Sequence, residues 1–154
     1  MSSLPAYRTP VVEDWIDYNG HLSEAYYVLV FGFATDQVMA EIGLGPEVRQ
    51  ATGASLYTVE AHVRYVQEVP LGAELTVTTT IVGSGAKKLH LAHEMSVGGE
   101  VVATEEVLCL HVSGQPAASA PFAPEVAERI AAYSAGGAEP TRPEWVGRAV
   151  GQRP

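Results

Sequence analysis

The longest apolar stretch of the chain, residues 23–42, contains only three charged side chains: Glu24, Asp36 and Glu41. It is too long for a strand, and it ends at Gly43, a residue type that commonly follows a helix. The pattern predicts a helix over residues 23–42, with Glu24 in the first turn, where a negative charge suits the helix dipole. Because this helix is apolar on most of its circumference, we expect it to be largely buried.

Strand periodicity follows the helix. Residues 55–65 alternate apolar and polar side chains, as a half-buried strand does. Three more runs rich in valine and threonine, separated by glycine-containing turns, predict strands over 74–82, 89–97 and 100–112. Ahead of the helix, residues 9–15 are predicted as a short first strand, and residues 45–53 as a connection without regular structure.

This order of elements predicts an α+β fold in one domain. A helix that is apolar nearly all round needs a sheet wrapped about it, so the four later strands are expected to form an antiparallel sheet around the helix. The domain covers residues 1–135, with a linker over 115–124 and a short helix over 124–133, and the tail over 136–154 is expected to be loosely ordered. A curled sheet leaves edges, and covering one of them predicts a homodimer or a larger assembly such as a homotetramer.

Composition narrows the classes of function. The chain has 154 residues, 47% of them hydrophobic, and a formal net charge of -9. That charge argues against nucleic acid and anionic membrane as partners, because both need a basic face. The first residues lack a signal-peptide pattern, and no apolar run approaches the roughly 20 residues that cross a bilayer, so we expect a cytoplasmic protein. The single cysteine, Cys109, is expected to be a buried apolar residue, and no metal cluster is expected.

Residues 17–24, with the sequence DYNGHLSE, carry the candidate chemistry. They place the Asp17 carboxylate and the His21 imidazole directly before a helix N-terminus, whose free N–H groups can polarise a carbonyl. An aspartate is ordinarily ionised at neutral pH, so Asp17 could attack that carbonyl or activate a water molecule. An aspartate and an asparagine before a helix are, however, most often caps and turn formers.

The order of motifs over roughly residues 9–112 resembles the hot-dog thioesterases of the 4-hydroxybenzoyl-coenzyme A thioesterase type. The motifs are Asp17-x-x-Gly20-His21, Tyr26-Tyr27 on the long helix, and the segment from Tyr57 through Arg64-Tyr65 to Pro70-x-Gly72. The resemblance implies the hot-dog fold and hydrolysis of an acyl-CoA thioester, with no cofactor besides the CoA of the substrate. It makes Asp17 the catalytic carboxylate, aided by His21, and assigns polarisation of the thioester to the amide N–H of Glu24. Many members carry an Asn pair after Gly-His, where this chain has Ser23 and Glu24.

Five further segments resemble the thioesterases of carnitine degradation, which cleave betainyl-CoA to glycine betaine and also occur fused to a carnitine dehydrogenase. These segments are 14–21, 25–27, 34–36, 52–58 and 87–91. Aromatic faces attract quaternary cations, and acidic side chains such as Glu24 or Glu60 could add Coulomb attraction. The candidate acyl-binding residues are Trp15, Tyr18, Asn19, Gly20, Tyr26, Tyr27, Tyr57, Glu60 and Tyr65. The candidates for binding the CoA phosphates are Arg64, Lys87 and Lys88.

Other interpretations stay open at this point. The same tyrosines suit a benzoyl group or another short acyl group. A hot-dog hydratase resembles a pattern with Asp and His five positions apart, whereas Asp17 and His21 are four apart. Only the carboxylate before the helix argues against a non-catalytic acyl-CoA-binding domain. Glu60 or His62 could orient a water molecule or belong to a plain polar row, and His90 and His93 should face opposite sides of a strand.

Overall fold

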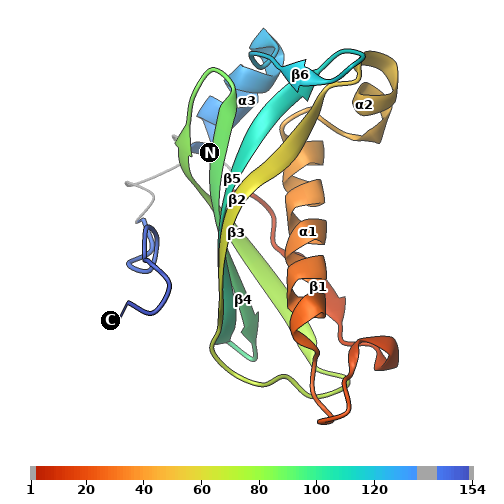
Figure 1. The fold of residues 1–154 in the computed structure, drawn as a ribbon, viewed down its shortest axis with the longest axis vertical. Coiled ribbons are helices and arrows are strands. Elements are labelled where there is room, and N and C mark those ends of the chain that lie inside the picture. The colour runs from red at the N-terminus through yellow and green to blue at the C-terminus, as the bar shows by residue number, and fades with distance from the viewer. Residues whose placement is uncertain (1–2, 135–141, 153–154) are drawn as a thin grey trace.

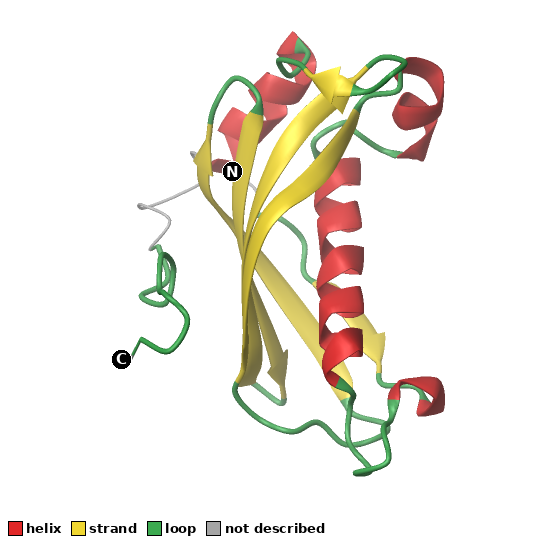
Figure 2. Ribbon diagram, viewed as in Figure 1, coloured by secondary structure: helices red, strands yellow, loops and turns green. Residues whose placement is uncertain are grey.

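One long helix lies beside a curled antiparallel sheet in the computed structural model, which describes residues 3–134 and 142–152 (Figures 1 and 2). The elements in chain order are β1 (Tyr7–Pro10), η1 (Glu13–Trp15), α1 (Glu24–Glu41), α2 (Pro46–Thr52), β2 (Ser55–Tyr65), β3 (Glu74–Ser84), β4 (Lys88–Val97), β5 (Glu100–Ser113), β6 (Ala118–Ser119) and α3 (Pro124–Ser134). The strand order is β1-β3-β4-β5-β2, with β6 beside β5, and every pairing is antiparallel. The predicted α+β class and hot-dog fold are confirmed, and β2 forms one edge of the sheet.

The core lies between α1 and the concave face of the sheet. From α1, Val30 and Phe31 are fully buried, and Leu75 and Met95 of the sheet share their cluster with no exposed surface. Burial of such apolar side chains is the dominant favourable term in folding. Cys109 is buried in a second cluster around Ile42, as predicted, and burial raises the pKa of its thiol to about 11.

The helix is less buried than its composition predicted. Val28 and Leu29 remain 42% and 38% exposed, because the sheet of one chain covers only one side of α1. Among the described residues no single helix is long and apolar enough to cross a membrane, although α1 and α2 together, bent by 72°, meet that criterion. The apolar side of α1 that faces away from the sheet is therefore partly uncovered in the single chain.

Two predicted segments differ in their local structure. The first strand was expected over residues 9–15, but β1 ends at Pro10 and residues 13–15 form a turn of 3-10 helix. The connection over residues 45–53 contains the short helix α2, with Pro46 in its first turn and Gly53 at its end with φ +73°. A left-handed glycine after a helix and a proline at its start are both standard signals, so this helix was readable from the sequence.

The predicted tail is only partly described, and residues 136–141 and 153–154 lie outside the described residues. Residues 142–152 form turns on the outer face of the sheet, the face turned away from α1 (Figure 1). There the Trp145 indole donates a hydrogen bond to Glu94, and the Gly147 N–H donates to Glu106. These contacts attach residues 142–152 to strands β4 and β5.

The inner face of the sheet carries a polar row under α1. The imidazole of His93 is fully buried and hydrogen-bonded to Thr79 at 2.7 Å and to Thr35 of α1 at 2.9 Å. Burial lowers the pKa of His93 to about 4, so the ring stays neutral near pH 7. His90, in contrast, pairs with Glu106 at 2.7 Å on the outer face, which confirms that the two histidines face opposite sides.

Glu105 continues this row next to His93 in the sheet register, opposite Val63 of β2. Its side chain is only 6% exposed, and burial raises its pKa to about 7. The carboxyl lines a cavity of about 270 Å³ between α1 and β2, together with Thr35 and Asp36. A carboxyl in such a position is nearly as stable protonated as ionised at neutral pH.

Candidate active site

The Asp17 carboxylate is held by the loop that leads into α1. The Asp17 N–H donates to the His21 carbonyl at 2.9 Å, and the Gly20 N–H donates to the Asp17 carbonyl at 3.0 Å. The Asp17 side chain accepts a hydrogen bond from the Asn19 N–H at 2.8 Å. Gly20 has φ +82°, a conformation that other residues adopt only with strain, so the glycine is needed to close this loop.

The N-terminus of α1 has no side-chain cap. Ser23 occupies the cap position without a capping hydrogen bond, and Glu24 begins the helix. Asp17 therefore stabilises the preceding turn and does not cap the helix. Because the N–H groups of a first helical turn have no partner within the helix, these donors can polarise a carbonyl oxygen.

A cavity of about 610 Å³ opens at this loop, and it brings together several predicted residues. The predicted residues that line it are Asp17, Asn19, His21, Glu24, Tyr27 and Tyr65. Three lining residues carry carboxyl groups (Asp17, Glu24 and Glu68), and none of the described lining residues is a lysine or an arginine. The pocket therefore combines negative charge with aromatic surface.

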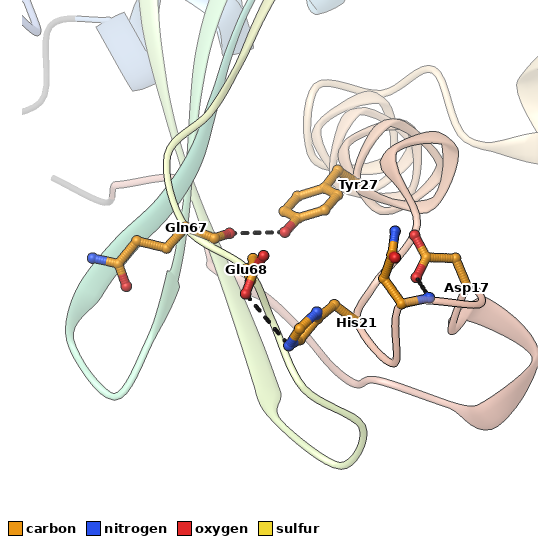
Figure 3. A network of polar contacts seen from close by, with 6 residues as sticks. Asp17, His21, Tyr27, Gln67 and Glu68 are labelled. Atoms are coloured by element: carbon orange, nitrogen blue, oxygen red, sulfur yellow. Dashed lines mark hydrogen bonds and ion pairs between the residues drawn. The ribbon is translucent and has the colours of Figure 1, made fainter.

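Two tyrosines form the aromatic wall of the pocket. The rings of Tyr27 and Tyr65 meet edge to face, with centroids 5.1 Å apart and planes at 89°. The Tyr27 hydroxyl donates to the Gln67 carbonyl at 2.8 Å (Figure 3). The Tyr65 hydroxyl donates to the Glu24 carbonyl at 3.4 Å. Burial, reinforced by neighbouring charges, raises the pKa of both hydroxyls, so both stay protonated and fixed as donors.

The segment after β2 supplies the opposite wall, and sequence reasoning missed it. Glu68 pairs with His21 at 3.4 Å between Oε2 and Nε2 (Figure 3). The two loops are joined by the Leu22 N–H, which donates to the Val69 carbonyl at 2.8 Å, and by a bridge between His21 and Pro70. A signal was present, because Glu68 lies between Tyr65 and Pro70, inside the segment that carries the family resemblance.

The remaining predicted acyl-binding residues do not line this pocket in the single chain. Trp15 stacks on Tyr26, with ring centroids 6.1 Å apart, and packs against the core beside the loop. The side chain of Tyr18 is 97% exposed, and Tyr57 is 53% exposed near the start of β2. Glu60 lines a separate cavity with His62, His90 and Glu106.

The predicted CoA-binding residues lie in two places. Arg64 lines a cavity on the outer face with Trp145 and Arg148. Lys87 and Lys88 lie at the turn between β3 and β4, at the other end of the sheet from Asp17 (Figure 1). Within residues 3–134 and 142–152, no group of three or more His, Cys, Asp or Glu side chains could hold a metal ion.

Comparison with known proteins places the chain among thioesterases. The Thioesterase-like superfamily matches residues 11–130. A betainyl-CoA thioesterase of Pseudomonas aeruginosa is 43% identical, covering 98% of this chain and 96% of that protein. An L-carnitine dehydrogenase/betainyl-CoA thioesterase of Rhizobium meliloti is 35% identical over 94% of this chain, which spans 29% of that longer protein.

Solved structures agree with these sequence matches. A candidate thioesterase of Pseudomonas putida is 40% identical with a TM-score of 0.84, covering 100% of this chain and 99% of that one. A Staphylococcus aureus protein solved in complex with CoA is 27% identical with a TM-score of 0.89, covering 96% of this chain and 94% of that one. The extent of the family match, together with the helix-and-sheet architecture, leads to one conclusion: the chain is a member of the Thioesterase-like superfamily.

Proposed function

We propose that this protein hydrolyses betainyl-CoA to glycine betaine and CoA. The observation that carries the proposal is the pocket at Asp17, which joins three carboxyl groups to an edge-to-face tyrosine pair, with no lysine or arginine among its described lining residues. A trimethylammonium group cannot donate a hydrogen bond, so aromatic faces and negative charge are what recognise it. The relatives named as betainyl-CoA thioesterases support the same substrate.

The proposed reaction assigns a step to each of these residues. The thioester carbonyl lies against the first turn of α1, where the N–H of Glu24 stabilises the oxyanion that forms. Asp17 either attacks the carbonyl carbon itself or removes a proton from the water that attacks it. The carbon–sulfur bond then breaks and CoA leaves as its thiol. If Asp17 has attacked, water hydrolyses the anhydride that it forms with the acyl group, and on either route the acyl group ends as a carboxylate. His21, held beside Glu68, is placed to exchange the proton.

Release of thiol from betainyl-CoA tests the proposal, with a neutral substrate as the matched control. In the control, carbon replaces the ammonium nitrogen, so shape is kept and only charge changes. An aromatic site that prefers the cation by about 2 kcal/mol predicts a kcat/KM ratio of roughly 30 in its favour. The ratio is corrected by the hydroxide hydrolysis rates of the two thioesters, because the cation also activates its carbonyl.

Three results would contradict the proposal in different ways. Equal corrected values would remove betainyl-CoA as the preferred substrate. Faster release from benzoyl-CoA would favour the aromatic alternative. Absence of thiol release from every acyl-CoA tested would favour a hydratase or a binding domain, since neither liberates CoA.

We also propose that the protein works as a homodimer paired along β2. This strand has β5 as its only neighbour among the described residues. Val59 of the strand is 56% exposed, and Val28 of α1 is 42% exposed. Antiparallel pairing of two β2 strands would cover this edge and bring Lys87 and Lys88 of one chain toward the pocket of the other. CoA phosphates could then reach the predicted lysines.

Light scattering should therefore give a mass of twice 16.3 kDa or a multiple of it at micromolar concentration. Val59→Asp places a charge on the exposed edge and should shift the protein toward monomer. Val150→Asp, at a side chain 87% exposed in the C-terminal segment, is the matched control and should leave the mass unchanged. A folded wild-type monomer would contradict the dimer.

A further inference from the structure

Two carboxylates lie on separate walls of the pocket at Asp17. Asp17 belongs to the loop before α1, whereas Glu68 belongs to the segment that follows β2. Figure 3 shows Asp17 and Glu68 on either side of the space next to the Tyr27 ring. Burial raises the pKa of the Tyr27 hydroxyl, and the charges of Glu68 and Asp17 raise it further, which agrees with both carboxylates lying near this ring.

Glu68 has little to balance its charge. Its only ion pair among the described residues is with His21 at 3.4 Å, which counts as a charge pair only when the imidazole is protonated. Its side chain is 78% exposed and bound to no lysine or arginine in the described part of the chain. A carboxylate that is open to the pocket and not neutralised can bind a cation from the substrate.

The dimensions of the acyl group fit this arrangement. In betainyl-CoA the ammonium nitrogen is two bonds from the carbonyl carbon, so a carbonyl held at Asp17 keeps the cation within the same pocket. The edge-to-face pair of Tyr27 and Tyr65 lies in that pocket and offers aromatic surface to the methyl groups. Because Asp17 acts at the carbonyl carbon, a different carboxylate is needed to bind the cation.

We infer that Glu68 is the specificity-determining carboxylate that binds the cationic end of the acyl group. The inference rests on the proposed function. It assigns recognition of the cation to Glu68, whereas the sequence suggested Glu24 and Glu60. Glu60 lines another cavity, and Glu24 sits in the first turn of α1, where the helix dipole already partly balances its charge. Glu68 binds the trimethylammonium group by Coulomb attraction from the wall opposite Asp17.

The test compares Glu68→Gln with wild type on betainyl-CoA and on its neutral carbon analogue. The variant should lose about tenfold in kcat/KM for betainyl-CoA and less than about twofold for the neutral analogue, which corresponds to removal of one partly screened charge. Glu100→Gln, at the turn between β4 and β5, changes the net charge equally and should alter neither value. Raising the ionic strength should reduce the cation preference of wild type more than that of the variant.

Each other outcome overturns the inference. An equal loss on both substrates with a changed pH profile would make Glu68 a positioning residue for His21. If Glu68→Gln kept the preference for the cationic substrate, Glu68 would have no part in recognition. If Glu24→Gln lost as much of that preference as Glu68→Gln, recognition would not depend on Glu68 in particular. Failure of the proposed function is seen separately, because wild type itself would then show no preference for the cation.

Discussion

Asp17→Asn should reduce thiol release by at least about 100-fold, because an amide is neither an anionic nucleophile nor an effective base. The fold should survive the change. The side-chain oxygen of asparagine can still accept the hydrogen bond from the Asn19 N–H that Asp17 accepts at 2.8 Å. The measurement is kcat/KM from thiol release, together with the midpoint of thermal unfolding.

Asp14→Asn is the matched control, since it removes the same charge from an exposed residue in η1. It should leave the rate near that of wild type. A variant Asp17→Asn that kept more than about a tenth of the wild-type rate, a barrier change below roughly 1.4 kcal/mol, would show that Asp17 is not the catalytic carboxylate. A large fall in its unfolding midpoint would instead mean that the side chain mainly supports the turn.

Glu105→Gln should stabilise the protein at pH 8, and the gain should shrink as the pH falls. Burial raises the pKa of Glu105 from its ordinary 4.5 to about 7, so between these values the folded chain binds a proton that the unfolded chain has released. Wild-type stability therefore falls as the pH rises through this window. Linkage gives a change of about 2.5 kcal/mol in the advantage of the variant between pH 5 and pH 8.

Urea unfolding at several pH values and one protein concentration measures this difference. His93, whose pKa is lowered to about 4, contributes the opposite slope between pH 4 and 6.5, but it is present in both proteins and cancels in the comparison. The other ionisable groups near Glu105 are Asp36, across the cavity, and Tyr65 and Cys109, whose pKa values the Glu105 charge helps to raise. A difference that does not change with pH would show that the Glu105 carboxyl is well solvated.

The order of elements could be predicted because periodicity is a local property. The long helix and the four later strands were found within a few residues of their observed ends, since their side chains repeat every 3.6 or 2 positions. Residues 13–15 were misassigned as strand because Val11 and Trp15 pack toward the core from an irregular segment. Three residues of alternation do not distinguish a strand from a 3-10 turn.

The candidate site was predicted only where its residues are close in the sequence. Asp17, His21 and Glu24 were found together because one motif contains them, and the structure keeps them around one pocket. Glu68 enters the site through pairing between two loops, as in the bond from Leu22 to Val69, and neither propensity nor spacing predicts such a contact. Glu60 was favoured as an acidic neighbour of the candidate aromatic residues, but its side chain lines a different cavity.

The two tryptophans of the chain lie in parts of the molecule with different roles. Trp15 stacks on Tyr26 beside the loop that holds Asp17, whereas Trp145 attaches the C-terminal segment to Glu94 on the outer face of the sheet. Intrinsic fluorescence can therefore be divided between them. Replacing Trp145 by phenylalanine leaves Trp15, whose emission reports on the order of the loop that holds Asp17. Replacing Trp15 leaves Trp145, whose emission reports on detachment of the C-terminal segment.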